Sequence, residues 1–579
     1  MTRTNGLGIE HKFVYHKVQV KRPDVSKALN QSDAERLQGE VGGWSDVLFT
    51  EPKVGVSYAH GMGVAQAANE LLRVVEERRV SISDQLDTTD RSRLGQFFTP
   101  LAVAQFMASL PSLPLSGRLR VLDPGAGNGS LTAALVARIV SERPDIDLDV
   151  TVFEVDETLC PELEQTLTGC RQLARQAGCH MTARLIVGDF LEWAATSVGR
   201  LPFEGEGPAQ FDLVIMNPPY RKVNVAGAER RALQSIDVEV TNLYAAFVAM
   251  AIALLDVEGQ IAAITPRSFT NGPYFRSFRR YFFGKMLFER LHVYESRSKA
   301  FAGDAVLQEN IIFGARRRRS VDIDPSVVIS TSDGPSDLAS TRVVPHSEIV
   351  LGNDPERFVH IMADNADAAV GRSVLGLPSR IKDLKIEVST GRVVDFRAKE
   401  HLRFEPQLGA VPLIYPGHLR GGGIAWPGAL HRKPSWIVAC VATASLLLPT
   451  ATYVVVKRFT SKEERRRVVA AVFGPSDVSS DVVAFENHLN VFHVNGNGLS
   501  PDIARGLAAW LNSTVVDRYV RSFNGHTQIN ATDLRRLPYP AAAELQRLGT
   551  ALGEPAEADQ EKIDSLVSVC VKELRDTAA

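Results

Sequence analysis

A series of short, largely apolar runs separated by helix-length segments constrains the fold more than any other feature of the sequence. The first five runs are Leu119–Leu122, Leu148–Phe153, Arg184–Val187, Leu213–Met216 and Ile261–Ile264. Such alternation is typical of βαβ units, whose strands are parallel and whose helices cover both faces of one sheet. The sequence therefore predicts an α/β domain with a parallel sheet, a buried helix over Tyr244–Leu255, and closing strands over Leu291–Tyr294 and Asn310–Phe313.

The character of the chain changes on both sides of this series. At 579 residues the chain is too long for one ordinary domain. The sequence predicts an N-terminal extension over 1–90 with a helix near Gly63–Arg79, the α/β domain over 91–320, and a Ser-, Asp- and Pro-rich linker or long excursion over 321–374. A domain of short strands, among them Ile386–Val388 and Tyr453–Val456, and a helix over Pro501–Asn512 is expected over 375–540, and a helical acidic tail over 541–579.

Composition excludes several classes of protein. The five cysteines form no CxxC pair, which argues against a zinc site and a disulfide framework and predicts a metal-free protein of the reducing cytoplasm. The most apolar run, Tyr244–Leu255, is well short of the roughly 20 residues that a membrane span needs. Because the formal net charge is -2, binding to nucleic acid would have to depend on local basic patches.

A glycine-rich loop follows the first strand. Asp123, Pro124, Gly125 and Gly127 lie between this strand and the next helix, at the carboxyl edge of the sheet where open α/β folds bind ligands. Glycines let the backbone turn sharply and approach a ligand closely. The loop predicts a cofactor site, although a generic turn has the same composition.

Two further acids stand at the ends of the next two strands. Glu154 can accept ribose hydroxyls, while Asp189 can accept a hydrogen bond from an adenine amine with Phe190 lying against the ring. Any one of these acids is equally well explained as a solvated loop carboxylate. Acids at three successive strand ends nevertheless favour one shared nucleoside site.

The fourth strand runs directly into Asn217, Pro218, Pro219 and Tyr220, the most informative stretch of the chain. Two prolines fix two φ angles, so that Pro218 presents its carbonyl in a rigid direction beside the side-chain carbonyl of Asn217. This pair of acceptors can hold both hydrogens of one amine, and Tyr220 can stack on the attached base. Such acceptors stabilise positive charge that grows on the nitrogen. A Pro-Pro turn that merely closes a strand is the alternative.

Together these residues resemble the amino-methyltransferases of bacterial restriction-modification systems, specifically the gamma-type adenine-N6 DNA methyltransferases of type II systems. That family has a Gln-Phe-Phe-Thr-Pro segment, here Gln96 to Pro100, before the glycine loop and the tetrapeptide. The resemblance covers roughly Arg91 to Pro540. It implies a Rossmann-like S-adenosylmethionine-dependent methyltransferase domain and a C-terminal α+β target-recognition domain. It also implies S-adenosyl-L-methionine as cofactor and double-stranded DNA as substrate, with the target base flipped out of the helix.

The resemblance assigns two more positions. It places Thr99 and Pro100 near the methionine end of the cofactor, whereas local sequence alone reads them as the N-cap and first turn of a helix over Leu101–Leu110. It makes Phe301 the aromatic residue that holds the extruded adenine against Tyr220, although a core phenylalanine is an equal alternative. The insertion around Gly199–Gly207 leaves the placement of Phe190 open.

Candidate DNA contacts come from basic clusters and from one polar stretch. The residues chosen are Arg276, Arg279, Arg280, Arg458, Asn524, His526, Gln528 and Asn530. Arginines can hold phosphates, and the four polar residues can pair with base edges or phosphates. Each cluster can also be a solvated helix face, and the polar residues can cap a helix and fix a loop.

Three alternatives remain at this point. A protein-glutamine or ribosomal-RNA methyltransferase would use the same two acceptors, but does not usually carry so long a C-terminal region. A DNA-binding protein with a catalytically silent core would not need the intact tetrapeptide. No convincing nuclease cluster stands in the first 90 residues, so cleavage would need a separate cognate endonuclease as partner.

Overall fold

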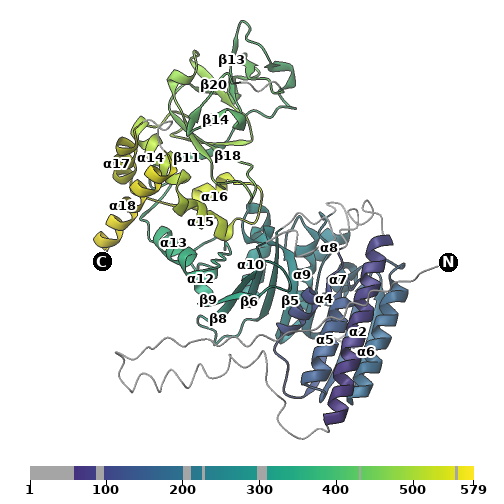
Figure 1. Cartoon of the computed structure of the whole chain (residues 1–579). Coiled ribbons are helices and arrows are strands. Elements are labelled where there is room, and N and C mark those ends of the chain that lie inside the picture. Colours follow the sequence, from purple (N-terminus) through teal and green to yellow (C-terminus); the bar gives the residue numbers. More distant parts are fainter. Residues whose placement is uncertain are drawn as a thin grey trace, which may run out of the picture. The chain divides into compact units, whose positions relative to one another are not determined.

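Figure 1 shows the computed structural model of the chain, which describes residues 58–85, 97–199, 210–223, 228–295, 309–428, 432–553 and 559–578. Phe301, Gln96 and most of the 199–207 insertion lie outside the described residues. The sheets and the site belong to one compact unit, residues 61–579. Among the described residues no helix is both long and apolar enough to cross a membrane.

A nine-stranded sheet forms the core of the α/β part, in the order β3-β2-β1-β4-β5-β7-β6-β8-β9. Strands β1 to β5 are parallel, while β7 runs antiparallel to both β5 and β6. The strands are β1 (Gly117–Pro124), β2 (Ile146–Glu154), β3 (Met181–Val187), β4 (Phe211–Met216), β5 (Leu255–Pro266), β6 (Met286–Tyr294), β7 (Asn310–Arg317), β8 (Ser326–Ser332) and β9 (Ser340–Pro345). All seven predicted strands are confirmed as parts of β1 to β7.

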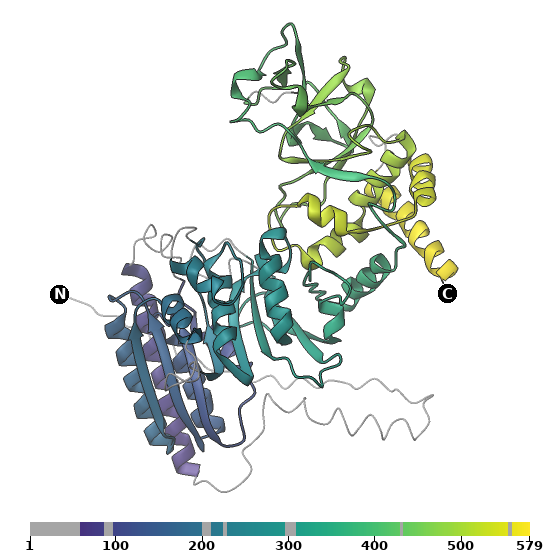
Figure 2. The same ribbon diagram turned by 180° about the vertical axis from the view of Figure 1, so that it is seen from behind.

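Helices cover both faces of this sheet, as Figure 2 shows from behind. Side chains alternate along each strand, so that Val121 packs into one apolar core and Leu122 into the other. One face carries α2 (Tyr58–Gln85), α4 (Leu101–Ser109), α5 (Ser130–Glu142) and α6 (Cys160–Ala177). The other carries α7 (Phe190–Val198), α8 (Ala228–Gln234), α9 (Leu243–Leu254) and α10 (Arg276–Lys285). The predicted buried helix is therefore confirmed as α9, and β5 begins directly after it.

The N-terminal helix α2 supports the glycine loop from behind. The Nδ2 of Asn128 donates to the carbonyl of Val75 over 3.2 Å, and the Oε2 of Glu76 accepts from the backbone N–H of Leu101 at the start of α4 over 3.1 Å. Leu72 and Val75 are buried in the same core as β1. This segment is thus part of the α/β fold rather than a separate appendage.

The segment over 321–374, expected as a linker or a long excursion, contains regular secondary structure. Strands β8 and β9 extend the sheet beyond residue 320, and α12 (His346–Ile349) and α13 (Asn365–Leu375) follow. Val327 and Ile329 are fully buried on β8. In β8 and β9 only a few apolar residues alternate with polar ones, and polar residues flank both strands. The local composition therefore resembles that of a linker.

The C-terminal part is a mixture of short strands and helices, consistent with the predicted α+β class. A four-stranded sheet has the order β11 (Glu387–Thr390), β21 (Leu489–His493), β18 (Tyr453–Lys457) and β19 (Ala470–Phe473). A five-stranded sheet has the order β12 (Leu402–Arg403), β16 (Trp436–Val438), β13 (Ala410–Ile414), β20 (Val482–Phe485) and β17 (Leu447–Pro449). Two short pairs join β10 (Ser379–Arg380) to β22 (Pro538–Tyr539), and β14 (Leu419–Arg420) to β15 (Gly423–Ile424).

Among the described residues, five α-helices accompany these strands. They are α14 (Pro501–Asn512), α15 (Thr514–Phe523), α16 (Ala531–Arg536), α17 (Ala542–Leu552) and α18 (Gln560–Ala578). The last two were expected as a tail, but they pack on the C-terminal part. A Cβ built on Gly506 of α14 would lie 1.8 Å from the carbonyl oxygen of Leu545 in α17. The backbones of α14 and α17 therefore touch, because glycine stands at the crossing point.

Replacing Gly506 with alanine is expected to separate α14 from α17. The new methyl group would meet backbone atoms that cannot rotate away, so the loss of stability should reach the upper part of the range of about 1–3 kcal/mol for overpacked sites. Urea denaturation measures it as a lower midpoint. Gly284→Ala on α10 is the matched control, since a Cβ there meets nothing within 4 Å. Equal midpoints for the two variants would contradict the close crossing.

Candidate functional site

The glycine loop at the end of β1 is held open by its own backbone. Gly125 and Gly127 have φ angles of +78° and +58°, which side chains other than glycine rarely adopt. The N–H groups of Gly125 and Ala126 both donate to the carbonyl of Phe153, over 2.9 and 2.8 Å. A Cβ on Gly127 would lie 3.2 Å from the ring of Phe98. The loop thus leaves a crevice that side chains on these glycines would narrow.

Asp123 lies behind the loop rather than in the crevice. Its side chain is fully buried, and its Oδ2 accepts from the hydroxyl of Thr132 in the first turn of α5 over 2.7 Å. Burial raises the pKa of Asp123 to about 7, with the bond from Thr132 acting in the opposite direction. The structure therefore places Asp123 where it fixes the loop to α5, and neither Asp123 nor Pro124 lines the crevice.

Glu154 joins the loop to the end of β2. Its Oε2 accepts from the N–H of Gly127 over 2.8 Å, and its Oε1 accepts from the N–H groups of Val155 and Asp156 over 2.9 Å each. Burial raises the pKa of Glu154, while these backbone N–H groups oppose the rise. An ionised carboxylate offers about four lone-pair sites. Three are used here, so Glu154 has room for about one further donor rather than two.

Asp189 and Phe190 begin α7 at the end of β3. Asp189 is the N-cap of the helix, and its Oδ1 accepts from the N–H groups of Leu191 and Glu192 over 2.7 and 3.2 Å. Phe190 packs against Phe153 and Phe247, with ring centroids 5.4 and 5.1 Å apart. Both residues line the crevice. Asp189 also caps α7, a role that was not predicted from the sequence.

One crevice of about 180 Å³ brings together six of the ten predicted cofactor residues, but Thr99, Pro100, Asp123 and Pro124 do not line it. Its walls combine the glycine loop, two acids, several apolar rings and the start of the Asn-Pro-Pro-Tyr turn. They include Gly125, Gly127, Glu154, Asp189, Phe190, Asn217, Pro219, Arg221 and Phe247. Acceptors for hydroxyl and amine groups beside apolar rings suit a nucleoside, so the residues present fit a cofactor that contains adenosine.

Asn217 follows β4 and faces this crevice in a fixed orientation. Its Nδ2 donates to the carbonyl of Phe97 over 2.8 Å and to the Oγ1 of Thr99 over 3.1 Å. Both amide hydrogens are therefore used, and they orient the Oδ1 away from the 97–99 segment. Thr99 is not the N-cap that local sequence suggested, because Pro100 takes that position and makes no side-chain cap. Thr99 instead orients Asn217.

Tyr220 is more enclosed than its predicted role requires. Its hydroxyl donates to the Oδ1 of Asn217 over 2.9 Å, and its ring lies 5.5 Å from that of Phe97 and 6.4 Å from that of Tyr244. Only 9% of Tyr220 is exposed, and Pro218 is also buried. In this conformation Tyr220 lines neither the crevice nor the larger cavity described next. Stacking of Tyr220 on a base therefore requires its ring to separate from that of Phe97.

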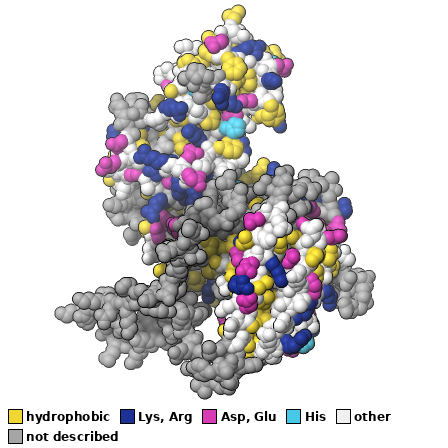
Figure 3. All heavy atoms as spheres, turned by 45° about the vertical axis from the view of Figure 1, so that its right-hand side comes forward, with side chains coloured by type: hydrophobic (Ala, Val, Ile, Leu, Met, Phe, Trp, Pro, Cys, Tyr) yellow, Lys and Arg dark blue, Asp and Glu magenta, His cyan; other side chains and the backbone are white. Residues whose placement is uncertain are grey.

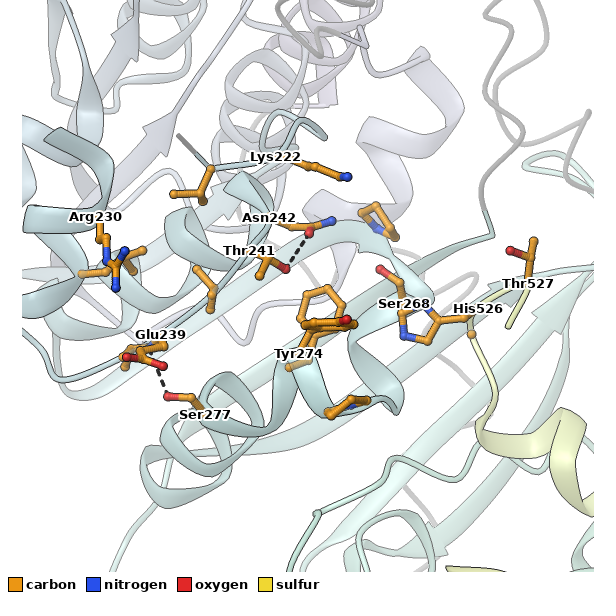
Figure 4. A pocket seen from close by; sticks show the side chains of 18 of the residues that line it. Lys222, Arg230, Glu239, Thr241, Asn242, Ser268, Tyr274, Ser277, His526 and Thr527 are labelled. Atoms are coloured by element: carbon orange, nitrogen blue, oxygen red, sulfur yellow. Dashed lines mark hydrogen bonds between the residues drawn. The ribbon is translucent and has the colours of Figure 1, made fainter. Parts of the chain in front are cut away.

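A second and larger cavity, of about 1020 Å³, lies beyond the same turn (Figure 4). It is lined from three directions, by the segment after Tyr220, by the end of β5 with the following 3₁₀ turns η1 (Arg267–Thr270) and η2 (Pro273–Phe275), and by the C-terminal stretch 525–527. Its polar residues include Lys222, Arg230, Asn242, Ser268, Tyr274, His526 and Thr527. We refer to this cavity as the cleft.

The C-terminal stretch and η1 are locked together beside the cleft. The Nη2 of Arg267 donates to the carbonyls of Arg521 and Ser522, over 2.9 and 2.7 Å. Thr270 donates its hydroxyl to the carbonyl of Phe523 over 2.6 Å. A Cβ on Gly525 would lie 2.2 Å from the carbonyl oxygen of Arg267. His526 is therefore held against the α/β domain at the edge of the cleft.

The structure corrects two of the expected DNA contacts. Arg279 is 0% exposed, and its guanidinium donates to the carbonyls of Glu356, Phe269, Asn271 and Gly272. Burial lowers its pKa to about 10. Asn524 is also buried, since its Oδ1 accepts from Arg467 and its Nδ2 donates to the carbonyl of Gln528 over 3.0 Å. Neither side chain is available to DNA.

The other expected contacts divide into three groups. His526 lines the cleft, stacks on Phe275 at 5.9 Å, and has its pKa lowered by burial. Arg280 is exposed and Arg276 partly so, beside a separate hollow next to the cleft. Asn530 is the N-cap of α16, where its N–H donates to Asp533, while Arg458 and Gln528 are half-buried near Phe459.

Sequence reasoning missed most of the residues that line the cleft. Lys222 and Asn242 stand 20 residues apart, and Ser268 and Tyr274 follow together after β5. The position of Lys222, two residues after Tyr220, was the one available signal. The others meet only because β4 and β5 are neighbours and because the C-terminal stretch returns to this edge of the sheet.

A parallel sheet with a glycine loop after β1, an acid after β2 and an Asn-Pro-Pro-Tyr turn after β4 defines the α/β class of S-adenosylmethionine-dependent methyltransferases that the sequence predicts. Comparisons with known proteins agree. The family model "Eco57I restriction-modification methylase" matches residues 187–301. The type II methyltransferase M.BsuBI of Bacillus subtilis is 42% identical over 498 residues, which cover 86% of this chain and 97% of its own.

The type II methyltransferase M.PstI of Providencia stuartii is 40% identical over 500 residues, covering 86% of this chain and 96% of its own. The chain therefore belongs to the type II methyltransferase family of restriction-modification systems. Among solved structures, the type IIL restriction-modification enzyme MmeI in complex with DNA aligns with 90% of this chain and 75% of that chain, at 12% identity and a TM-score of 0.48.

Proposed function

We propose that this methyltransferase transfers a methyl group from S-adenosyl-L-methionine to the N6 amine of adenine in double-stranded DNA. One observation carries the proposal: Asn217 lines the glycine-lined crevice at the end of β4, its amide donates to Phe97 and Thr99, and its Oδ1 accepts from the Tyr220 hydroxyl. Type II methyltransferases at 40–42% identity and the restriction-modification methylase model support methylation within a restriction-modification system. A cytoplasmic location and a separate cognate endonuclease are part of the same proposal.

The chemistry requires acceptors rather than a strong base. The lone pair of an adenine amine is delocalised into the ring, and hydrogen bonds from both N–H groups to Asn217 and Pro218 favour a pyramidal nitrogen. These oxygens also stabilise the positive charge that grows on nitrogen during the transfer. When bound, S-adenosyl-L-methionine supplies an electrophilic methyl group on sulfonium. The chain positions the two reactants and stabilises charge.

Tyr220 can keep its hydrogen bond to Asn217 when a target base binds. A carbonyl oxygen has two lone pairs, so the Oδ1 of Asn217 can accept from the Tyr220 hydroxyl and from an amine at the same time. For stacking, we propose that the incoming base takes the place of Phe97 against the Tyr220 ring. Phe301 stays the proposed residue on the other face of the base.

In the cofactor crevice, Glu154 would accept one ribose hydroxyl with its remaining lone pair, and Asp189 would accept the adenine amine of the cofactor with the oxygen not used in capping α7. Phe190 and Phe247 supply apolar walls. The two acids would thus bind the nucleoside part of the cofactor. Thr99 would have an indirect role, because it orients the amide of Asn217 beside the methyl group.

The DNA is proposed to lie along the cleft. A base inside a duplex cannot reach Asn217, so the target must be extruded while backbone contacts hold the flanking strand. Lys222 and Arg230 are exposed cations that line the cleft, and Arg280 lies on the adjoining surface. On the face seen in Figure 3, Lys and Arg side chains are interspersed with Asp and Glu, so a local cation pair matters more than overall charge.

Removing the cations of the cleft is expected to reduce the salt dependence of DNA binding. Each phosphate contact contributes about 0.9 to the slope of log K against log salt, so Lys222→Ala with Arg230→Ala should lower the slope by about 1.8. Titrations of duplex DNA at several salt concentrations measure the slope. The control is Arg175→Ala, which removes an exposed cation from α6, away from the cleft. An unchanged slope in the double variant would contradict the proposal that DNA lies along the cleft.

One assay tests the proposed function directly. The protein is incubated with S-adenosylmethionine labelled on the methyl group and with duplex DNA, RNA or a protein extract, and the products are digested and identified. Label in N6-methyladenine is the expected result. Label in glutamine or in RNA would replace the proposal with one of the rival methyltransferase activities, and transfer to no substrate would indicate a DNA-binding protein with a silent core.

A further inference from the structure

Tyr274 is an aromatic side chain held in the open on the wall of the cleft. It is 65% exposed, whereas the next residue, Phe275, is 3% exposed. Figure 4 shows its ring in the middle of the cleft lining, with Arg230 on one side and His526 on the other. The cavity around this ring is concave and carries Lys222, Arg230 and Glu239, and an aromatic ring beside polar groups in a concavity is typical of a binding site.

The turn that carries Tyr274 is fixed from both sides. Gly272, two residues earlier, has a φ of +77°, and a Cβ there would lie 2.9 Å from the Nε2 of His526. Phe275 stacks between Tyr244 and His526, with ring centroids 5.7 and 5.9 Å apart. The guanidinium of Arg279 holds the carbonyl of Gly272 over 3.0 Å. The backbone that carries the exposed Tyr274 is therefore rigid. Binding through Tyr274 should cost little conformational entropy.

Three packed rings separate Asn217 from the backbone position next to Tyr274. Tyr220 contacts Asn217, Tyr244 contacts Tyr220 edge-on at 6.4 Å, and Phe275 stacks on Tyr244. Tyr274 lines the cleft but not the crevice that contains Asn217. Its ring is thus placed for a nucleotide beside the target rather than for the target base itself.

We propose that Tyr274 stacks on a DNA base next to the extruded adenine, and so stabilises the opened duplex in the cleft. This inference rests on the proposed function, because it takes duplex DNA as the ligand. Every base offers a π-face to an aromatic ring, so this contact is independent of the recognition sequence. Lys222 and Arg230, which line the same cleft, supply the positive charge that the phosphates on either side of that base require.

The test compares Tyr274→Ala, Tyr274→Phe and the native chain in binding to a duplex that contains the mapped methylation site. Loss of one stacked base costs about 1–3 kcal/mol, so Tyr274→Ala should bind about 5- to 150-fold more weakly. Tyr274→Phe keeps the ring and should bind like the native chain. A 2-aminopurine beside the target is expected to become brighter in the Tyr274→Ala complex, because it loses its stacking partner.

Two controls separate this role from others. Val257→Ala removes an exposed apolar side chain near the start of β5, away from the cleft, and should leave DNA binding unchanged. Binding of S-adenosylmethionine to Tyr274→Ala should also be unchanged, because Tyr274 does not line the crevice. Unchanged DNA affinity in Tyr274→Ala, or an equal loss in Tyr274→Phe, would overturn the inference.

Failure of the proposed function gives a different pattern. A native chain that binds duplex DNA but methylates another group would contradict the adenine proposal and still allow the Tyr274 comparison. A native chain that binds RNA or protein but no duplex DNA would overturn both.

Discussion

Asn217→Ala should lower the rate of methyl transfer by about 10²- to 10³-fold, the cost of removing one preorganised group that stabilises charge in a transition state. The substitution deletes the acceptor at the end of β4 and the two hydrogen bonds that orient it, to Phe97 and Thr99. Single-turnover methylation measures the rate without a contribution from product release. Affinity for S-adenosylmethionine should change little, because Glu154 and the glycine loop remain in place.

Asn217→Asp tests the acceptor oxygen separately from the amide donors. Aspartate keeps an oxygen acceptor but loses the amide donors to the 97–99 segment, so its rate should lie between those of the native chain and Asn217→Ala. A loss of cofactor binding as large as the loss of transfer in Asn217→Ala would contradict the proposed role, since it would mean that Asn217 mainly holds the crevice together.

Glu154→Ala should weaken binding of S-adenosylmethionine by about 10- to 150-fold, which corresponds to the roughly 1.5–3 kcal/mol of a hydrogen bond to a charged group. The loss has two sources. The variant removes the acceptor for the ribose, and it also frees the N–H of Gly127, which Glu154 now fixes over 2.8 Å. Isothermal titration with S-adenosylmethionine measures the affinity, and a thermal melt without cofactor measures the loop's contribution to stability separately.

Glu157→Ala is the matched control for Glu154, since it removes an exposed acid three residues further along that does not line the crevice. Unchanged cofactor affinity in Glu154→Ala, with a lower melting temperature, would show that the carboxylate only ties the loop to β2.

Much of the α/β part follows from local patterns. The seven predicted strands and the helices α9 and α14 are clear in the sequence because apolar runs of strand or helix length are bounded by turn residues. The crevice was also accessible, since residues at the carboxyl ends of neighbouring parallel strands must meet. This is why Gly125, Glu154, Asp189 and Asn217 lie together.

What the sequence could not provide depends on contacts between distant segments. Nothing near Arg279 indicates that four carbonyls would surround it, so a buried arginine resembled a surface cation. Asp123 resembled a ligand-binding acid, but it is enclosed behind the loop. The sequence analysis does not single out Tyr274, and only the folded cleft distinguishes it from the buried Phe275.

The most direct test of the account is the structure of the complex with duplex DNA and a non-reactive cofactor analogue. The account predicts that one adenine lies outside the helix, with its N6 within about 3.2 Å of both the Oδ1 of Asn217 and the carbonyl oxygen of Pro218. A complex in which every adenine stays paired, or in which the extruded base lies away from these two oxygens, would contradict it.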